Sequence, residues 1–260
     1  MVLAATLICG ASLFTSCKKD EDNNLKLEEK IIGKWMIADR DGQAALTNEK
    51  SVLTVLSATE ALLSTSRDNY SSTSSKWYAH LECSVAIDGN RVTITGHPNE
   101  HSTLIHELNI HSITTTKMEV TFKHITKRDG EVIATNGPME MRWVKITTDY
   151  EQAVLGTWQG HCTSEGSVFD DGQEHRWQYN ADGNFVYYVK DGDNWVPSAN
   201  TLNQYFVDGN LLCTRWVDNG EEHREWWEIT IDGSQMHWTA LRQNPDGTTF
   251  TATFEMEKVN

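Results

Sequence analysis

The second half of the chain is a series of short apolar segments separated by turn dipeptides. Asp-Gly occurs nine times in the whole chain and Asn-Gly twice, and both favour tight hairpins because Gly lacks a Cβ and Asp and Asn tolerate positive φ. The segments between these turns are rich in aromatic and β-branched residues, as strands require. Strands are therefore predicted at 154–163, 174–180, 184–190, 201–207, 210–217, 223–231, 235–243 and 248–258. Eight such strands form an antiparallel meander that can close into a barrel.

The first half shows the same pattern in its later part. Strands are predicted at 77–87, 91–96, 103–113, 117–126 and 131–146. The segment 51–66 has mixed apolar spacing, and its Ser57-Ala-Thr-Glu60 could be a capping box. Both a short helix and one or two strands are compatible with this segment. Residues 71–75, four Ser and one Thr, predict a loop.

The two halves repeat each other. Four landmarks recur at offsets of 123, 120, 118 and 117 residues, namely Gly33 with Gly156, Asp88 with Asp208, Met118 with Met236, and Asp129 with Asp246. A period near 120 residues is the size of a domain, so it indicates a tandem duplication and not a solenoid. The predicted fold is all-β, with two tandem up-and-down barrels of about eight strands, at residues 28–149 and 150–260.

The N-terminus has the composition of a signal peptide. Residues 2–16 contain no charge and are too few for a comfortable membrane span. They end in Phe14-Thr15-Ser16-Cys17, which resembles the lipobox of bacterial lipoproteins, whose cysteine is lipidated and becomes the mature N-terminus. The alternative is a fortuitous apolar N-terminus with an ordinary buried cysteine. Residues 1–16 are thus predicted to be a lipoprotein signal peptide, and Cys17 is predicted to carry palmitate and other acyl chains.

Residues 17–27 predict a polar tether between this anchor and the first barrel. Lys18-Lys19-Asp20-Glu21-Asp22 is charged and unable to pack. An acidic run directly after the lipidated cysteine also resembles the surface-export signal of some Gram-negative lipoproteins. The expected location is the outer membrane, on its periplasmic or cell-surface face.

A G-x-W motif opens the first predicted strand of each copy, at Gly33-x-Trp35 and at Gly156-x-Trp158. Together with the lipobox, this pattern resembles the lipocalin-like domains of bacterial lipoproteins. The resemblance implies that each Trp closes one end of its barrel, often beneath an Arg of the last strand. Arg142 is the candidate in the first copy, whereas Glu255 or Glu257 stands in that neighbourhood in the second. It also implies small-molecule binding, as in some members.

Charge and cysteine content narrow the classes of function. The net charge of −15 and a pI near 5.0 argue against a nucleic-acid partner, which needs a basic footprint. Beyond Cys17, Cys83, Cys162 and Cys213 remain, an odd number without metal-ligand spacing. Buried free thiols are the favoured interpretation, and a Cys162–Cys213 disulfide is the alternative.

No catalytic or metal-binding pattern is recognisable. His97, His101, His106 and His111 cluster in sequence, but on a strand the last three alternate faces and do not converge on one ion. They are interpreted as solvated histidines. Acidic runs such as 221–225 surround predicted turns, and no nucleophile elbow or phosphate loop is present. No catalytic residue, metal or cofactor is predicted, and a hydrolase built on buried carboxylates is the least favoured hypothesis.

Tryptophan is concentrated in the second copy. Seven of the ten lie there, and residues 150–260 hold 6 basic and 18 acidic residues, net −12. Trp226 and Trp227 are adjacent on a predicted strand, so one faces each side of the sheet. Trp227 shares its face with Ile229 and Ile231, which places it in the barrel interior. The ligand-binding candidates are Trp177, Trp195, Trp216, Trp226, Trp227 and Trp238. The alternative is that they fill a barrel or an interdomain contact.

These patterns favour a non-enzymatic envelope lipoprotein. Aromatic faces beside carboxylates are suited to stacking on a sugar ring and bonding its hydroxyls. The first hypothesis is therefore a small molecule or glycan bound in a barrel mouth or on a Trp-rich face of the second copy. The alternative is a scaffold lipoprotein whose filled barrels contact an envelope protein partner. An open cavity lined by Trp would favour the first.

Overall fold

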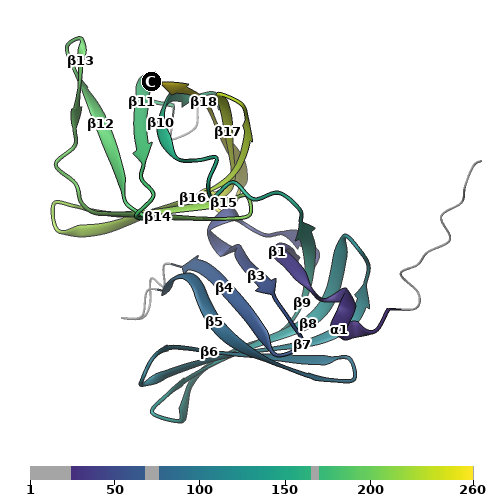
Figure 1. The fold of residues 1–260 in the computed structure, drawn as a ribbon. Helices are drawn as coiled ribbons and strands as arrows, with labels where there is room; N and C mark the ends of the chain where they lie inside the picture. Colours follow the sequence, from purple (N-terminus) through teal and green to yellow (C-terminus); the bar gives the residue numbers. More distant parts are fainter. Residues whose placement is uncertain (1–24, 68–75, 165–169, 260) are drawn as a thin grey trace, which may run out of the picture.

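The computed structural model describes residues 25–67, 76–164 and 170–259, and these form two β-sheets that lie one beside the other along the molecule (Figure 1). The predicted signal peptide, Cys17, most of the predicted tether and the predicted loop at 71–75 lie outside the described residues. Within the described part, no helix is long and apolar enough to cross a bilayer.

The first sheet is a closed barrel. Its elements are α1 (Leu27–Lys30), β1 (Gly33–Arg40), β2 (Gln43–Ala44), the 3-10 turn η2 (Thr47–Glu49), β3 (Ser51–Val55), β4 (Glu60–Arg67), β5 (Lys76–Asp88), β6 (Arg91–Asn99), β7 (Ser102–Ile113), β8 (Lys117–Arg128) and β9 (Glu131–Ile146). Neighbours in sequence pair antiparallel from β3 to β9, and β1 pairs with both β3 and β9. This second pairing closes eight strands and removes the sheet edges.

The second sheet curls without closing its ladder. Its strands are β10 (Gly156–Cys162), β11 (Glu174–Tyr179), β12 (Phe185–Asp191), β13 (Asn194–Pro197), β14 (Thr201–Asp208), β15 (Leu211–Asp218), β16 (Glu221–Asp232), β17 (Gln235–Gln243) and β18 (Thr249–Val259). The order runs from β13 at one edge to β14 at the other. Among the described residues, one isolated bridge, Asn184 with Gln204, and the Tyr205 N–H to Gly183 carbonyl bond of 2.9 Å join the turn before β12 to β14. The β12–β13 hairpin extends away from this junction (Figure 1).

The all-β, two-barrel prediction is confirmed in its fold class, with the second sheet curled and not fully closed. The eight predicted strands of the second copy correspond to β10–β12 and β14–β18, and β13 is additional. The open question at 51–66 is settled as two strands, β3 and β4, because β3 pairs with β1 and β4 with β5. At Asp41-Gly42, Asp129-Gly130 and Asn219-Gly220 both turn residues have positive φ, as a type I′ hairpin requires.

Each G-x-W motif forms the same seal at one end of its sheet. The indole N–H of Trp35 donates to the Ile31 carbonyl at 2.7 Å, and that of Trp158 to the Val154 carbonyl at 2.6 Å. Both rings are fully buried. Gly33 is needed because its φ of +126° is a backbone conformation that residues with a Cβ rarely adopt.

The cation above each sealing Trp is a lysine, so the expectation for Arg142 is wrong. The Lys145 ammonium lies 5.1 Å from the ring centre of Trp35, and Lys258 lies 5.0 Å from that of Trp158. Arg142 alternates to the outer face of β9, where its Nε is 2.5 Å from Asp39. The second copy therefore also has a cation above its sealing Trp, and this cation is Lys258. Glu255 and Glu257, the neighbouring residues considered from the sequence, do not take this position.

A third apolar cluster joins the two sheets. Trp226 and Phe206 of the second sheet pack with Met36 and Val52 of the first, and the Trp226 indole N–H donates to the Ser66 carbonyl at 2.6 Å. Trp226 is therefore on the outer face of its sheet, as its alternation with Trp227 predicts, but it is 7% exposed because the first barrel covers it.

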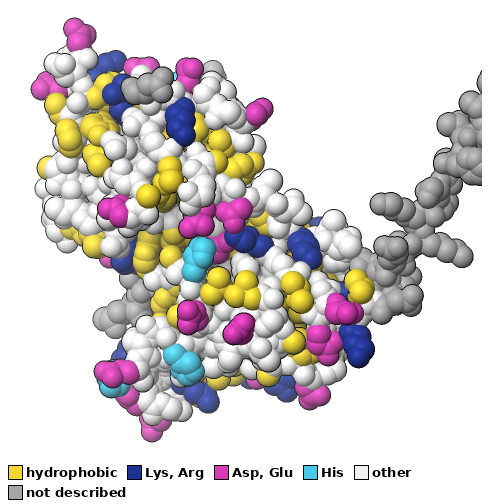
Figure 2. Space-filling model, in the orientation of Figure 1, with side chains coloured by type: hydrophobic (Ala, Val, Ile, Leu, Met, Phe, Trp, Pro, Cys, Tyr) yellow, Lys and Arg dark blue, Asp and Glu magenta, His cyan; other side chains and the backbone are white. Residues whose placement is uncertain are grey.

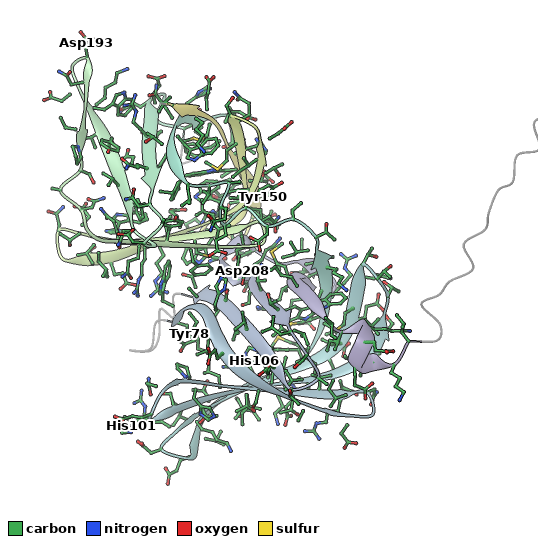
Figure 3. The ribbon with its side chains drawn as sticks, in the orientation of Figure 1. Tyr78, His101, His106, Tyr150, Asp193 and Asp208 are labelled. Carbon is green, nitrogen blue, oxygen red and sulfur yellow. The ribbon has the colours of Figure 1, made fainter. Side chains whose placement is uncertain are left out.

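Ion pairs surround this contact. Lys34 lies 2.6 Å from both Asp149 and Asp208, and Asp208 is 1% exposed. Lys50 lies 2.6 Å from Glu228. Figure 2 shows acidic, basic and histidine side chains meeting where the two halves adjoin, and Figure 3 marks Asp208 at this position. The halves are joined by both apolar packing and paired charges.

Candidate functional site

A cavity of about 510 Å³ lies inside the second sheet. One wall is β11 and β12, and the facing wall is β15, β16, β17 and β18. Its aromatic lining consists of Trp177, Tyr179, Phe185, Tyr187, Trp216, Trp227, Trp238 and Phe254. Period-two alternation explains the set, since residues 175, 177 and 179 of β11 and 185, 187 and 189 of β12 share one face.

The rings form a continuous aromatic surface. Trp177 and Trp238 have centroids 4.9 Å apart, and Trp227 and Trp238 are 5.3 Å apart. Phe254 lies 5.3 Å from Trp227 in an edge-on arrangement. Tyr187 extends the surface, at 5.3 Å from Trp177. Neighbouring rings at these separations support one another, which holds the faces in place for a ligand.

Two buried polar groups of this lining have no hydrogen-bond partner in the described structure. Trp238 is 2% exposed and its indole N–H has no hydrogen-bond acceptor, and Tyr179 is 1% exposed and its hydroxyl is unbonded. Burial raises the pKa of Tyr179 well above its ordinary value, with Tyr205 adding to the effect. Both groups can therefore donate a hydrogen bond to an acceptor in the cavity, and an unpaired buried donor favours such a partner.

His175 connects the aromatic surface to the mouth of the cavity. Its ring stacks on Trp177 at 5.4 Å, and it is bonded to Tyr187 at 3.0 Å and to Asp171 at 3.2 Å. Burial acts to raise the pKa of Asp171, but the amide of Gln173 and the charge of His175 outweigh it and lower this pKa. Asp171 therefore stays ionised at the mouth.

A second carboxylate lies deeper. Glu225 of β16 lines the cavity, and its Oε2 is 2.5 Å from Nη2 of Arg242 on β17. Burial raises the pKa of Glu225 and the Arg242 guanidinium opposes that rise. Arg242 also lies 4.9 Å from the ring centre of Trp227. With Asp218 at the mouth, three carboxylates and neither a lysine nor an arginine are among the described lining residues.

The structure brings together four of the six candidate tryptophans, Trp177, Trp216, Trp227 and Trp238. Trp226 is used in the contact between the halves. Trp195 lies on β13 outside the cavity, where Arg176 stacks on it at 4.6 Å. The alternation of β11 and β12 could have found His175, Tyr179 and Tyr187, because each is two residues from another lining aromatic residue.

The other sequence candidates lie elsewhere. Cys83, Cys162 and Cys213 are buried, and Cys213 is in no disulfide, so the Cys162–Cys213 alternative is wrong. His101 and His111 are exposed, but His106 faces the interior of the first barrel against Phe122, at 5.1 Å between ring centres, so its interpretation as solvated is wrong. Among the described residues, no group of His, Cys, Asp and Glu is placed to hold a metal ion.

No protein-family model matches the sequence, and no curated protein matches it. Similar solved structures include Transferrin Binding Protein B of Haemophilus parasuis as a double mutant, at a TM-score of 0.23 and 8% identity, covering 80% of this chain and 60% of that one. Intact Ap-TbpB, with its N and C lobes, has a TM-score of 0.22 and 11% identity, covering 80% of this chain and 54% of that one. The chain spans little more than half the length of these structures, and at these scores the likeness carries no argument about its function.

Proposed function

We propose that the protein is a non-enzymatic binding lipoprotein whose second barrel holds a small neutral or cationic ligand, with saccharides as the first class to test. The observation that carries the proposal is the cavity of about 510 Å³ lined by four tryptophans. A sugar ring stacks on such faces through its C–H groups, and an organic cation is attracted by the electron-rich ring face.

The polar groups of the cavity support the same class of ligand. Trp238 and Tyr179 offer buried donors to a ligand oxygen, and the carboxylates of Asp171, Asp218 and Glu225 accept from hydroxyl or ammonium groups. An anionic ligand is disfavoured, because the carboxylates of Asp171 and Asp218, which line the cavity, would repel it. The alternative of filled barrels that serve only as a scaffold receives no support from a barrel that contains a cavity.

The test is a titration of intrinsic tryptophan fluorescence with mono- and disaccharides and with tetramethylammonium. Trp216→Ala removes a half-exposed wall of the cavity and should weaken binding at least tenfold. Trp195→Ala is the matched control, since Trp195 lies outside the cavity, and should bind like the wild type. No response to any probe, or equal loss in both variants, would contradict the proposal.

The anchor is a second part of the proposal. Cys17 carries the lipid, residues 18–27 are the tether, residues 28–149 and 150–260 are the two domains, and the protein sits in the outer membrane on the periplasmic or cell-surface side, where an envelope protein could also contact it. The lipobox-like run before Cys17 supports this assignment. Radiolabelled palmitate should enter the wild type and not Cys17→Ala. Equal labelling of both would refute the anchor and leave the cavity proposal standing.

A further inference from the structure

The first barrel contains a separate cavity, of about 460 Å³. One part of its lining is apolar and is formed by Ile37, Leu63, Leu104, Met139, Met141 and Trp143. These residues come from β1, β4, β7 and β9, so the apolar surface surrounds the cavity from several strands. It is suited to a short alkyl or other apolar tail.

The charged lining is of the opposite sign to that of the second barrel. Arg40, Lys76, His106 and His124 line the cavity, and among its described lining residues Glu49 is the single carboxylate. Glu49 lies 3.1 Å from Nη1 of Arg40. The chain has a net charge of −15, so this cluster of cations and imidazoles in one cavity is opposite in sign to the chain as a whole.

The nitrogen atoms of this cluster are mostly donors. Nζ of Lys76 lies 2.9 Å from Nε2 of His124, and because an ammonium only donates, that ring nitrogen is the acceptor. The His106 ring lies 4.8 Å from that of His124, and Figure 3 marks His106 in this barrel. The buried Nε of Arg40 has no hydrogen-bond partner in the described structure, and neither has the indole N–H of Trp143, a residue 1% exposed. Arginine and indole nitrogens cannot accept, so each can be satisfied only by an acceptor, supplied by a ligand or by water.

The second half helps to build this cavity. Gln243, at the end of β17, is one of the lining residues. The Leu241 amide donates to the Thr47 hydroxyl at 2.9 Å, which fixes the turn that carries Glu49. Arg224 donates to the Lys76 carbonyl at 2.7 Å and so fixes the start of β5. The cavity therefore needs both halves of the chain in place.

From this arrangement we infer that the first barrel binds an amphiphile with a carboxylate or phosphate head group and a short apolar tail. The head group accepts from Arg40 and Trp143 beside Lys76, and the tail lies against the leucine and methionine side chains. This site is independent of the proposed ligand of the second barrel and has the opposite charge preference.

Four probes with the same tail test the inference by calorimetry on the full mature chain. Decanoate and decyl phosphate carry the two acceptor head groups, decanol is neutral, and decyltrimethylammonium is cationic. Decanoate or decyl phosphate should bind at least tenfold more tightly than decanol, and the stronger of them identifies the head group. Decyltrimethylammonium, whose head group suits the second cavity, is measured in Trp216→Ala and should bind there at least tenfold more weakly than the anions. Equal binding of decanol, or no binding of either anion, would overturn the inference.

Variants locate the site. Arg40→Gln and, separately, Trp143→Phe, which keeps an aromatic ring and removes the donor, should each weaken binding of the anion about tenfold. Arg142→Gln is the matched control, because Arg142 lies on the outer face of the same barrel, and Trp216→Ala is the control in the second cavity. Loss of anion binding in Trp216→Ala with none in Arg40→Gln and Trp143→Phe would place the anion elsewhere and refute the site.

Discussion

Gly160 is a glycine of the second sheet that has no room for a side chain. It lies on β10, and a Cβ built there would be 1.8 Å from the backbone oxygen of Glu255 on β18. At Gly96 the nearest atoms are instead the side chains of Cys83 and Leu81. Gly160→Ala should therefore lower the free energy of unfolding by about 3 kcal/mol or more, because backbone must move, and Gly96→Ala by clearly less. Urea unfolding measures both, and equal losses would contradict this.

The free thiols give a second residue-scale prediction. Burial raises the pKa of Cys83 to about 11 and that of Cys213 well above its ordinary value. The thiolate is the reactive form, so both should resist iodoacetamide at about pH 8 in the folded protein and react once it is denatured. Peptide mass spectrometry reads each site. Cys213 lies in the apolar cluster between the two sheets, so labelling of native Cys213 at the rate of a free thiol would show that this contact opens in solution.

At the scale of elements, the hairpin β12–β13 is the weakest part of the second sheet. β13 pairs only with β12, through four residue pairs, and lies at a sheet edge, whereas β8 pairs along most of its length on both sides. Backbone amides of β13 should exchange with deuterium much faster than those of β8. Similar protection in both strands would indicate that the second barrel closes fully in solution.

The local sequence pattern is enough to predict most strands. It fails where the pairing of strands decides the secondary structure. The strands of the second copy follow from turn dipeptides and alternation, so their positions were predicted to within a few residues. Segment 51–66 was ambiguous because its spacing fits both a helix and strands, and only the pairing of β3 with β1 decides between them.

The candidate site also divides into residues that strand alternation predicts and residues that only tertiary contacts reveal. Alternation placed Trp227 inside, but it could not show that Trp226 is covered by the first barrel, since that depends on a surface over a hundred residues away. The charged cavity of the first barrel was also missed. Its basic residues come from β1, β5, β7 and β8, and no sequence pattern unites them.

At the scale of the whole molecule, Lys34 tests how the halves are held together. Lys34→Met would leave the nearly buried Asp208 without its cation, which should cost about 3 kcal/mol of unfolding free energy. In Lys34→Met combined with Asp208→Asn most of this loss should be recovered, because no buried unpaired charge remains. Asp149, the other partner of Lys34, is half-exposed and is solvated when the lysine is removed. Urea unfolding of the two single variants and the double variant measures the coupling, and strictly additive losses would contradict it.

The same contact predicts a loss of stability at high pH. Burial acts to lower the pKa of Lys34, but its bonds to Asp149 and Asp208 outweigh it and raise this pKa above 10.5. An amine whose pKa is raised on folding stabilises the folded state below its ordinary pKa, and this contribution disappears as the pH rises through the raised value. The wild type should therefore lose more stability than Lys34→Met above about pH 10.5. Parallel curves would contradict the assignment.

The most direct test of the central claim is the NMR spectrum of indole N–H groups in tryptophan-labelled protein during titration with the saccharide and tetramethylammonium probes. The account predicts that a probe that binds shifts the signals of Trp177, Trp216, Trp227 and Trp238. A ligand with an acceptor oxygen should move that of Trp238 most, because its N–H is buried without a partner. The signals of Trp35, Trp158 and Trp226, already bonded to backbone carbonyls, should stay in place. Unchanged cavity indoles with every probe, or shifts confined to Trp195, would contradict a ligand site in the second barrel.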